Sequence, residues 1–244
     1  SVDLSKFDTS KVQIFEDMFE YCSSLESVDT KYIKTDSAYD ISGMFKGCSS
    51  LTSVDISSFN TENLRDISYL FFQCTELEYV NFGKIDTEFI FAMEYMLANC
   101  TSLTEVDLSN FDTPELSTIQ NLFYGCTSLT DIDISNLDCS YVEVYDDLFI
   151  DLPTKGTIKF NSNKCSKIIG MIPATWDKKD EEIEENIPMG QETSRIAIQN
   201  IDWSNIHALD LYVLLNSFCG HVTILLVIVT CLHIFQNCCH SSVA

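Results

Sequence analysis

A 26-residue period runs through residues 1–152 of this chain and constrains its fold more than any other feature. Columns of similar residues recur at this step without a gap, which is typical of stacked repeat architectures. Leucine follows three residues after each repeated cysteine, and valine, threonine and phenylalanine columns keep the same period. We therefore expect an array of about six units, the first one truncated, instead of ordinary globular domains. The cysteine column consists of Cys22, Cys48, Cys74, Cys100 and Cys126.

Each unit divides into two halves with different hydrophobic patterns. In the first half, Val106 and Leu108 flank the polar Asp107, which indicates a β-strand with one buried face. In the second half, apolar residues recur at steps of three and four over residues 113–126, which indicates an amphipathic helix. Thr113 is a suitable N-cap for that helix. Since helices need more room than strands, the helical side should be convex and the strand side concave.

The amino-acid sequence of the units resembles that of a known family. The segments M-F-K-G-C-S-S-L at 44–51, L-T-S-V-D-I-S-S-F-N-T at 51–61 and L-F-Y-G-C-T-S-L at 122–129 are similar to BspA-like leucine-rich-repeat surface proteins. The resemblance covers 1–152 and extends through residues 153–176, which we expect to form a C-terminal cap. It implies a cell-surface or secreted role in adhesion, host binding or antigenicity. The predicted fold class is thus an α/β solenoid, a leucine-rich-repeat array of strand–turn–helix units.

An acidic column on the exposed strand positions predicts a binding surface. Asp follows the inward valine or isoleucine in most units, and alternation turns it away from the core. The net charge of −23 argues against nucleic acid as a partner. Two interpretations stay open, a binding stripe for a basic protein surface or cations, and a solvated face whose carboxylates bond to turn amides. The candidate binding residues are Asp29, Asp55, Tyr79, Asn81, Glu105, Asp107, Asp131 and Asp133.

Motifs for other chemistry are sparse. No paired cysteines with zinc-site spacing occur in 1–176, and no catalytic or phosphate-loop motif is present, so we expect no catalytic residue, metal or cofactor. The column cysteines are predicted to be buried free thiols. Cys139 and Cys165 lie outside that column and either stay free or pair in an oxidising compartment. Asn99 begins one glycosylation sequon.

The C-terminal part has a different composition. Residues 177–210 are acidic and predict a solvated linker or stalk. Residues 211–235 are mostly apolar and uncharged, long enough for a transmembrane helix that is followed by a short tail at 236–244. A cleaved lipid-anchor signal is the alternative, and Cys238 and Cys239 are candidates for palmitoylation.

Together these features predict a single-pass cell-membrane protein with an extracellular array. The expected activity is protein binding or adhesion through the concave acidic strand face, with a basic or host-surface protein as partner. The membrane is the second expected partner, and nucleic acid is not expected. Two other classes stay open, an intracellular leucine-rich-repeat scaffold and the recognition arm of a longer enzyme. The unpaired thiols suit a reducing compartment at least as well as an oxidising one.

Overall fold

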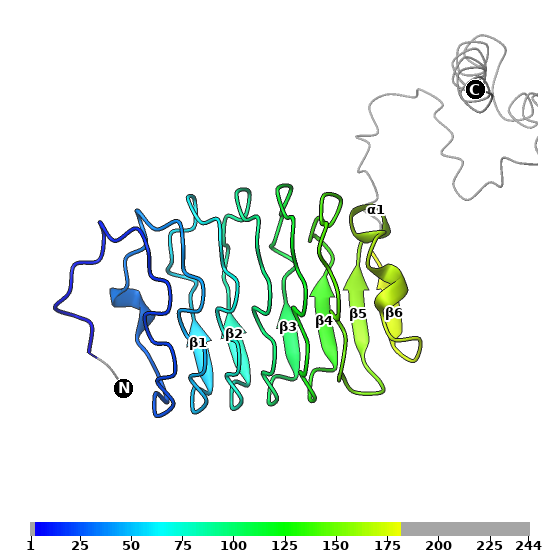
Figure 1. Cartoon of the computed structure of the whole chain (residues 1–244), viewed down its shortest axis with the longest axis horizontal. Coiled ribbons are helices and arrows are strands. Elements are labelled where there is room, and N and C mark those ends of the chain that lie inside the picture. The colour runs from blue at the N-terminus through cyan, green and yellow to red at the C-terminus, as the bar shows by residue number, and fades with distance from the viewer. Residues whose placement is uncertain (1–2, 182–244) are drawn as a thin grey trace, which may run out of the picture. The chain divides into compact units, whose positions relative to one another are not determined.

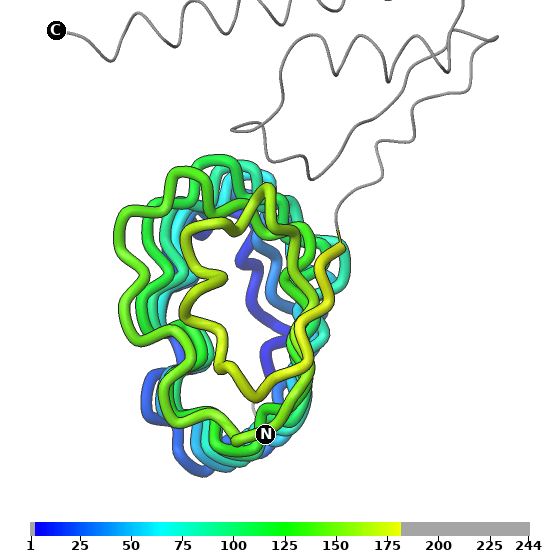
Figure 2. Tube along the Cα trace, turned by 90° about the vertical axis from the view of Figure 1, so that its right-hand side faces the viewer, coloured from blue at the N-terminus to red at the C-terminus, as the bar shows by residue number. Residues whose placement is uncertain are grey.

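A computed structural model describes residues 3–181, which coil into a solenoid of stacked rungs (Figure 1). Viewed along the stack, successive coils lie over one another as a flattened tube (Figure 2). Residues one period apart are paired, as in Val54 with Val80 and Val106 with Ile132. The predicted 26-residue repeat is therefore confirmed as the structural unit.

Short parallel strands form one wall of the solenoid, which we call the strand wall. The first two strands pair with each other, and the last four form a second sheet in chain order. Outward and inward side chains alternate along strands such as Ser53–Asp55 and Glu105–Asp107, so the inward residues enter the core. The elements in chain order are η1 (Thr30–Tyr32), β1 (Ser53–Asp55), β2 (Tyr79–Asn81), β3 (Glu105–Asp107), β4 (Asp131–Ile134), β5 (Thr157–Phe160), α1 (Ser162–Cys165), η2 (Ile169–Met171) and β6 (Asp177–Asp180).

Apolar columns fill the inside of the coils. The rings of Phe19, Phe45 and Phe71 stack, with centroids 5.5 and 5.6 Å apart and nearly parallel planes. Phe123 and Phe149 continue the column at 6.0 Å. A unit of this length cannot bury its apolar face alone, but each coil covers the face of the next.

The predicted helices in the second half of the units are wrong. Within residues 3–181 the structure has one α-helix, α1, and it belongs to the cap. Each unit instead holds two left-handed residues four positions apart, for example Gly43 (φ 60°) with Gly47 (φ 71°). Tyr69 (φ 58°) and Gln73 (φ 60°) occupy the same places one coil later. Left-handed residues interrupt an α-helix, which needs negative φ throughout.

Backbone hydrogen bonds in this half alternate between tight turns within one coil, such as the Cys22 N–H to the Phe19 carbonyl at 3.0 Å, and bonds between coils. The Phe15 N–H donates to the Asp40 carbonyl at 2.8 Å, and the Phe19 N–H donates to the Met44 carbonyl at 2.9 Å. Linked tight turns therefore produce the apolar steps of three and four. Because both walls are hydrogen bonded from rung to rung, the reason for expecting a concave strand face no longer holds. We call this second side the bridge wall, after the isolated parallel bridges that join Ile14, Asp40, Asp66, Ala92, Thr118 and Val144 in sequence.

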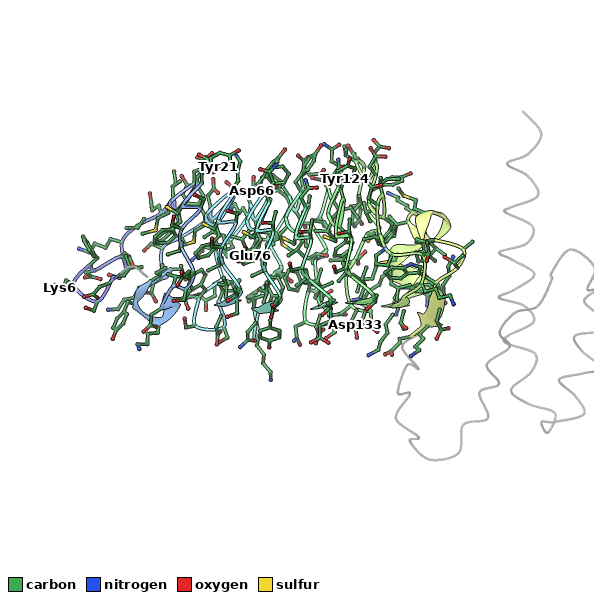
Figure 3. The ribbon with its side chains drawn as sticks, turned by 90° about the horizontal axis from the view of Figure 1, so that it is seen from below. Lys6, Tyr21, Asp66, Glu76, Tyr124 and Asp133 are labelled. Atoms are coloured by element: carbon green, nitrogen blue, oxygen red, sulfur yellow. The ribbon has the colours of Figure 1, made fainter. Side chains whose placement is uncertain are left out.

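The side chains show the same two-sided arrangement. In the view from below, Asp133 lies on the strand wall, while Tyr21 and Tyr124 lie on the opposite side of the stack (Figure 3). Tyr69 and Tyr95, one period apart, stack with ring centroids at 4.9 Å. Repetition thus places equal side chains in contact on the outside of the solenoid as well as in its core.

Buried threonines link neighbouring coils. Thr113 is 1% exposed, and its hydroxyl donates to the Asp138 carbonyl at 3.3 Å and accepts from the Asp138 N–H at 3.1 Å. Thr9 makes the same pair of bonds to Lys34 at 3.0 and 2.7 Å. The residue predicted as a helix N-cap therefore bonds to the following coil.

Replacing Thr113 with valine is expected to lower the free energy of unfolding by about 1–3 kcal/mol, because two backbone groups of Asp138 lose their partner. Thr113→Ser keeps the hydroxyl and loses only a methyl group, so it should cost about 0.8 kcal/mol. Urea unfolding followed by circular dichroism measures both. A valine variant at least as stable as the serine variant would contradict the bridging role of the hydroxyl.

A cap closes the C-terminal end of the solenoid. Trp176 is 5% exposed, and its indole N–H donates to the Pro153 carbonyl at 2.9 Å. The ring lies against Gly156, where an added Cβ would be 2.8 Å from it. All four residues of β6 are charged and exposed, which disfavours pairing of a further strand. Because β6 lies in the predicted linker, the folded part reaches beyond residue 176.

No helix within residues 3–181 is long and apolar enough to cross a bilayer. The predicted transmembrane helix at 211–235 and the tail at 236–244 lie outside the described residues, as do Cys238 and Cys239.

Candidate functional site

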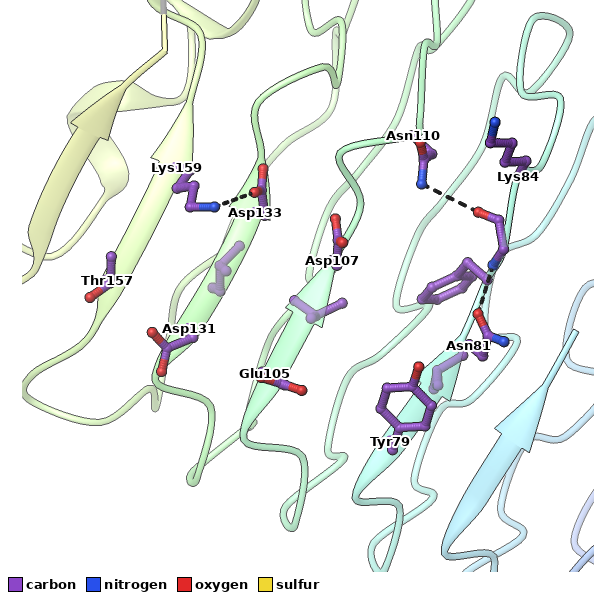
Figure 4. A pocket seen from close by; sticks show the side chains of 15 residues that line it. Tyr79, Asn81, Lys84, Glu105, Asp107, Asn110, Asp131, Asp133, Thr157 and Lys159 are labelled. Atoms are coloured by element: carbon purple, nitrogen blue, oxygen red, sulfur yellow. Dashed lines mark hydrogen bonds and ion pairs between the residues drawn. The ribbon is translucent and has the colours of Figure 1, made fainter. Parts of the chain in front are cut away.

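The outward side of the strand wall carries a hollow of about 580 Å³ that extends from β2 to β5 (Figure 4). It forms because alternate residues of four parallel strands point out of the same wall. Two predicted binding residues do not line this hollow. Asp55 lies on β1, and Asp29 pairs with Lys31 at 2.5 Å. The predicted binding residues that the structure brings together here are Tyr79, Asn81, Glu105, Asp107, Asp131 and Asp133.

Local hydrogen bonds hold one oxygen of the column residues that line the hollow, whereas Asp29 makes no such bond. Oδ1 of Asp107 accepts from the Ser109 N–H at 2.9 Å, and Oδ1 of Asp133 accepts from the Ser135 N–H at 3.1 Å. Asn81 accepts from the Gly83 N–H at 3.0 Å in the same manner. Bonding of the column side chains to turn amides is thus confirmed, and it fixes their orientation at the strand ends.

Asp133 is further engaged by a lysine. Lys159 Nζ lies 3.0 Å from Asp133 Oδ2 (Figure 4). Burial acts to raise the pKa of Asp133, but the bonds from Ser135 and Lys159 outweigh it and hold that pKa below its usual value. Asp133 therefore has both oxygens occupied and offers little to a ligand.

Three other carboxylates keep free acceptor capacity. Within residues 3–181, the side-chain carboxylate of Glu105 has no hydrogen-bond partner, and Asp107 Oδ2 has none either. Asp131 Oδ2 accepts from the Thr130 hydroxyl at 2.8 Å, which leaves its other oxygen without a partner among the described residues. Glu105 and Asp131 are paired in register on adjacent strands, so their charges repel by roughly 0.9 kcal/mol at a ~4.8 Å spacing in water.

Four polar or charged residues that line this hollow were not predicted as site residues. Lys84 and Asn110 come from the turns after β2 and β3, and Thr157 and Lys159 come from β5. A signal for β5 was available, because Thr157 and Lys159 lie one 26-residue period after Asp131 and Asp133. The Asn110 amide donates to the Gly83 carbonyl at 3.4 Å and closes the rim between two turns.

A second hollow lies on the bridge wall. Tyr39, Arg65 and Phe91 line it from three consecutive coils, and all three side chains are exposed. The Arg65 N–H donates to the Tyr39 carbonyl, and the Phe91 N–H donates to the Arg65 carbonyl, both at 2.9 Å. Their 26-residue spacing was visible in the sequence. It was overlooked because the three side chains differ in chemistry.

The column thiols are free, and four of them are buried as predicted, while Cys22 is exposed. Each buried Sγ donates to a backbone carbonyl, as Cys48 does to Phe19 at 3.2 Å and Cys126 does to Leu97 at 3.1 Å. Burial raises the pKa of Cys48 to about 11 and that of Cys126 to about 12. These thiols stay protonated at neutral pH and are poor nucleophiles.

The remaining predicted site residue is Asn99. It is half-buried and left-handed (φ 61°), and a Cβ on Gly125 of the next coil would lie 2.3 Å from its Oδ1. Its glycosylation stays a prediction. Within residues 3–181 no group of three His, Cys, Asp or Glu side chains is arranged to hold a metal ion.

The comparisons with known proteins assign the array to a family. The chain belongs to the family described as "Mycoplasma protein of unknown function, DUF285", whose model matches residues 1–84 and 40–167. A second family model, "ESF1 RRM domain", matches residues 193–235. A stretch of 38 residues is 60% identical to the "Pre-rRNA-processing protein esf1" of Schizosaccharomyces pombe, and it covers 16% of this chain and 6% of that protein. No solved structure matches.

Proposed function

We propose that this chain is a binding repeat protein whose strand wall contacts a positively charged protein segment. The observation that carries the proposal is the group of partly unpartnered carboxylates on Glu105, Asp107 and Asp131, which line one hollow. A lysine or arginine side chain placed between two rungs would reduce the repulsion between these carboxylates. Its own charge would be paired with them, so neither charge would be desolvated without a partner.

The rims of the hollow add selectivity. Tyr79 is 51% exposed beside the acidic strands and offers an aromatic face to a cation or an apolar side chain. Lys84 and Lys159 line the hollow near its two ends, so a uniformly basic ligand longer than the acidic part would meet like charges there. A short basic segment with polar or apolar flanks fits this pattern best.

Asp107→Asn together with Asp131→Asn should weaken binding of a short lysine-containing peptide by roughly 5–30-fold, since two attractive charge contacts are lost. The salt dependence of binding should decrease as well. The charge-matched control is Glu62→Gln with Glu88→Gln, two exposed carboxylates that do not line the hollow. Equal weakening in both double variants, measured by calorimetry, would show that only net charge matters.

We further propose that the array is a BspA-like adhesion module on the cell surface. The sequence of the repeats and membership in the matched family support this proposal. The hydrogen-bonded strand wall, which presents side chains outward, supports it as well. An intracellular scaffold or the recognition arm of a longer enzyme would use the same surface. Protease treatment of intact cells separates surface display from the intracellular scaffold, because only a displayed array is cleaved.

We propose separately that residues 211–235 attach the chain to the membrane. The alternative assignment is an RRM segment, because the same residues lie within the match to that family model. The apolar, uncharged composition supports a span. Alkaline carbonate extraction separates the two assignments. Retention in the membrane pellet supports the span, and release into the supernatant supports the other.

A role in RNA binding has one specific observation in its favour, the match over residues 193–235. The composition of that segment opposes it. Arg195 is the only Lys or Arg between residues 193 and 244, and phosphate contacts need several basic side chains. We therefore place protein binding before RNA binding.

A further inference from the structure

The threonine column changes its chemistry at the C-terminal end of the solenoid. It runs through Thr9, Thr35, Thr61, Thr87 and Thr113 and then continues as Cys139 and Cys165, each step being 26 residues. At the threonine positions the side chain bonds to the backbone of the following coil, as Thr113 does to Asp138. At the last two positions the two side chains contact each other.

The two thiols are close and enclosed. Cys139 Sγ lies 3.3 Å from Cys165 Sγ, and both residues are 0% exposed. Cys139 belongs to the last coil, and Cys165 ends α1 in the cap. Neighbouring rungs are ~4.8 Å apart, which is within the Cα separation that a disulfide requires. Cys165 Sγ also donates to the Leu137 carbonyl at 3.1 Å, as the other buried thiols do to carbonyls of their neighbouring coils, but no second thiol pair is in contact among the described residues.

We propose that Cys139 and Cys165 form a disulfide that staples the cap to the last coil when the chain folds in an oxidising compartment. The reaction is thiol–disulfide exchange with a small-molecule disulfide such as oxidised glutathione. One cysteine thiolate attacks the glutathione disulfide and releases one reduced glutathione. The second cysteine then attacks the mixed disulfide and releases another. Two electrons pass to glutathione, and both thiol protons end on the two leaving groups.

The surroundings of the pair decide when this reaction takes place. The neighbouring thiol of Cys165, together with burial, raises the pKa of Cys139 far above its usual value. A protonated, enclosed thiol reacts slowly, so the folded and reduced protein should resist oxidation. The staple therefore forms during folding, before the cap docks, and does not act as a sensor in the finished structure.

The test compares the full chain refolded in a glutathione buffer at an oxidising ratio with the chain refolded in excess reductant. After alkylation of free thiols, peptide mapping should find Cys139 and Cys165 joined, with the mass of two hydrogen atoms missing. The oxidised protein should unfold at a temperature roughly 5–12 °C higher, because the bond closes the loop between the last coil and the cap. Adding reductant during unfolding should remove the difference.

Two variants make the test specific. Cys139→Thr restores the residue type of the column, so the fold should persist while the dependence on redox conditions disappears. Cys126→Ala removes a buried thiol outside the pair and should keep that dependence. Alkylation of both Cys139 and Cys165 after oxidative refolding would overturn the proposal. Pairing of either residue with another cysteine would overturn it too.

Discussion

Replacing Phe71 with alanine should lower the free energy of unfolding by about 3–5 kcal/mol. Phe71 is 0% exposed, stacks on Phe45 at 5.6 Å and meets Phe82 edge-on at 6.3 Å. The coils on either side are fixed by rung-to-rung hydrogen bonds, so they have little freedom to fill the cavity. The loss therefore combines the transfer of the ring with the cost of an empty space.

The control for this variant is Phe89→Ala, because Phe89 is 51% exposed. It should change the stability by less than about 0.5 kcal/mol. Urea unfolding followed by far-ultraviolet circular dichroism gives both values. Equal effects of the two substitutions would mean that the phenylalanine column is not the core of the solenoid.

Replacing Trp176 with alanine is expected to have an effect of similar size, about 3–5 kcal/mol, but a local one. The indole covers Gly156 and bonds to the Pro153 carbonyl. In a solenoid each unit contacts only its neighbours, so loss of the cap should destabilise the adjoining strands first. Amide hydrogen exchange should become faster in β5 and β6 and should stay nearly unchanged in β1 and β2.

Trp176→Phe keeps an apolar ring in the cap and loses the indole hydrogen bond. It should cost about 1 kcal/mol beyond the difference in ring size. Faster exchange spread evenly over all strands in the alanine variant would contradict a local role for the cap.

The period and the strands could be predicted from the sequence because each depends on a simple pattern. Residues such as Val54, Val80 and Val106 are separated by one period, and in a solenoid that separation is also the pairing register. Alternation around Val106 then places Asp107 outside. No information about distant contacts was needed beyond the assumption that equal units stack.

The helix prediction failed because the apolar pattern reports which residues face inward and does not report their φ angles. Apolar steps of three and four fit an α-helix and also fit linked tight turns. Glycine occupies some of the left-handed positions, such as Gly43 and Gly47, but Tyr69, Gln73 and Tyr95 hold the same conformation without being glycine. Hydrogen bonds to the neighbouring coil offset the energetic cost of the left-handed conformation. These bonds cannot be inferred from the sequence of a single unit.

The candidate site was predicted in part for a related reason. The outward residues of β2, β3 and β4 were found by alternation, and they do line one hollow. The partner of Asp133 was missed because the period was not extended into the cap, where Lys159 takes the equivalent place. Charge counting alone therefore overstated how many carboxylates are free to bind a ligand.

An amide NMR titration of the full chain with a short lysine-containing peptide tests the central claim most directly. If the strand wall is the binding surface, the largest shift changes should fall on β2, β3 and β4 around Glu105 and Asp131. They should disappear in the Asp107→Asn, Asp131→Asn variant and persist in the Glu62→Gln, Glu88→Gln control. Changes centred on Tyr39, Arg65 and Phe91, or spread evenly over all coils, would contradict the claim.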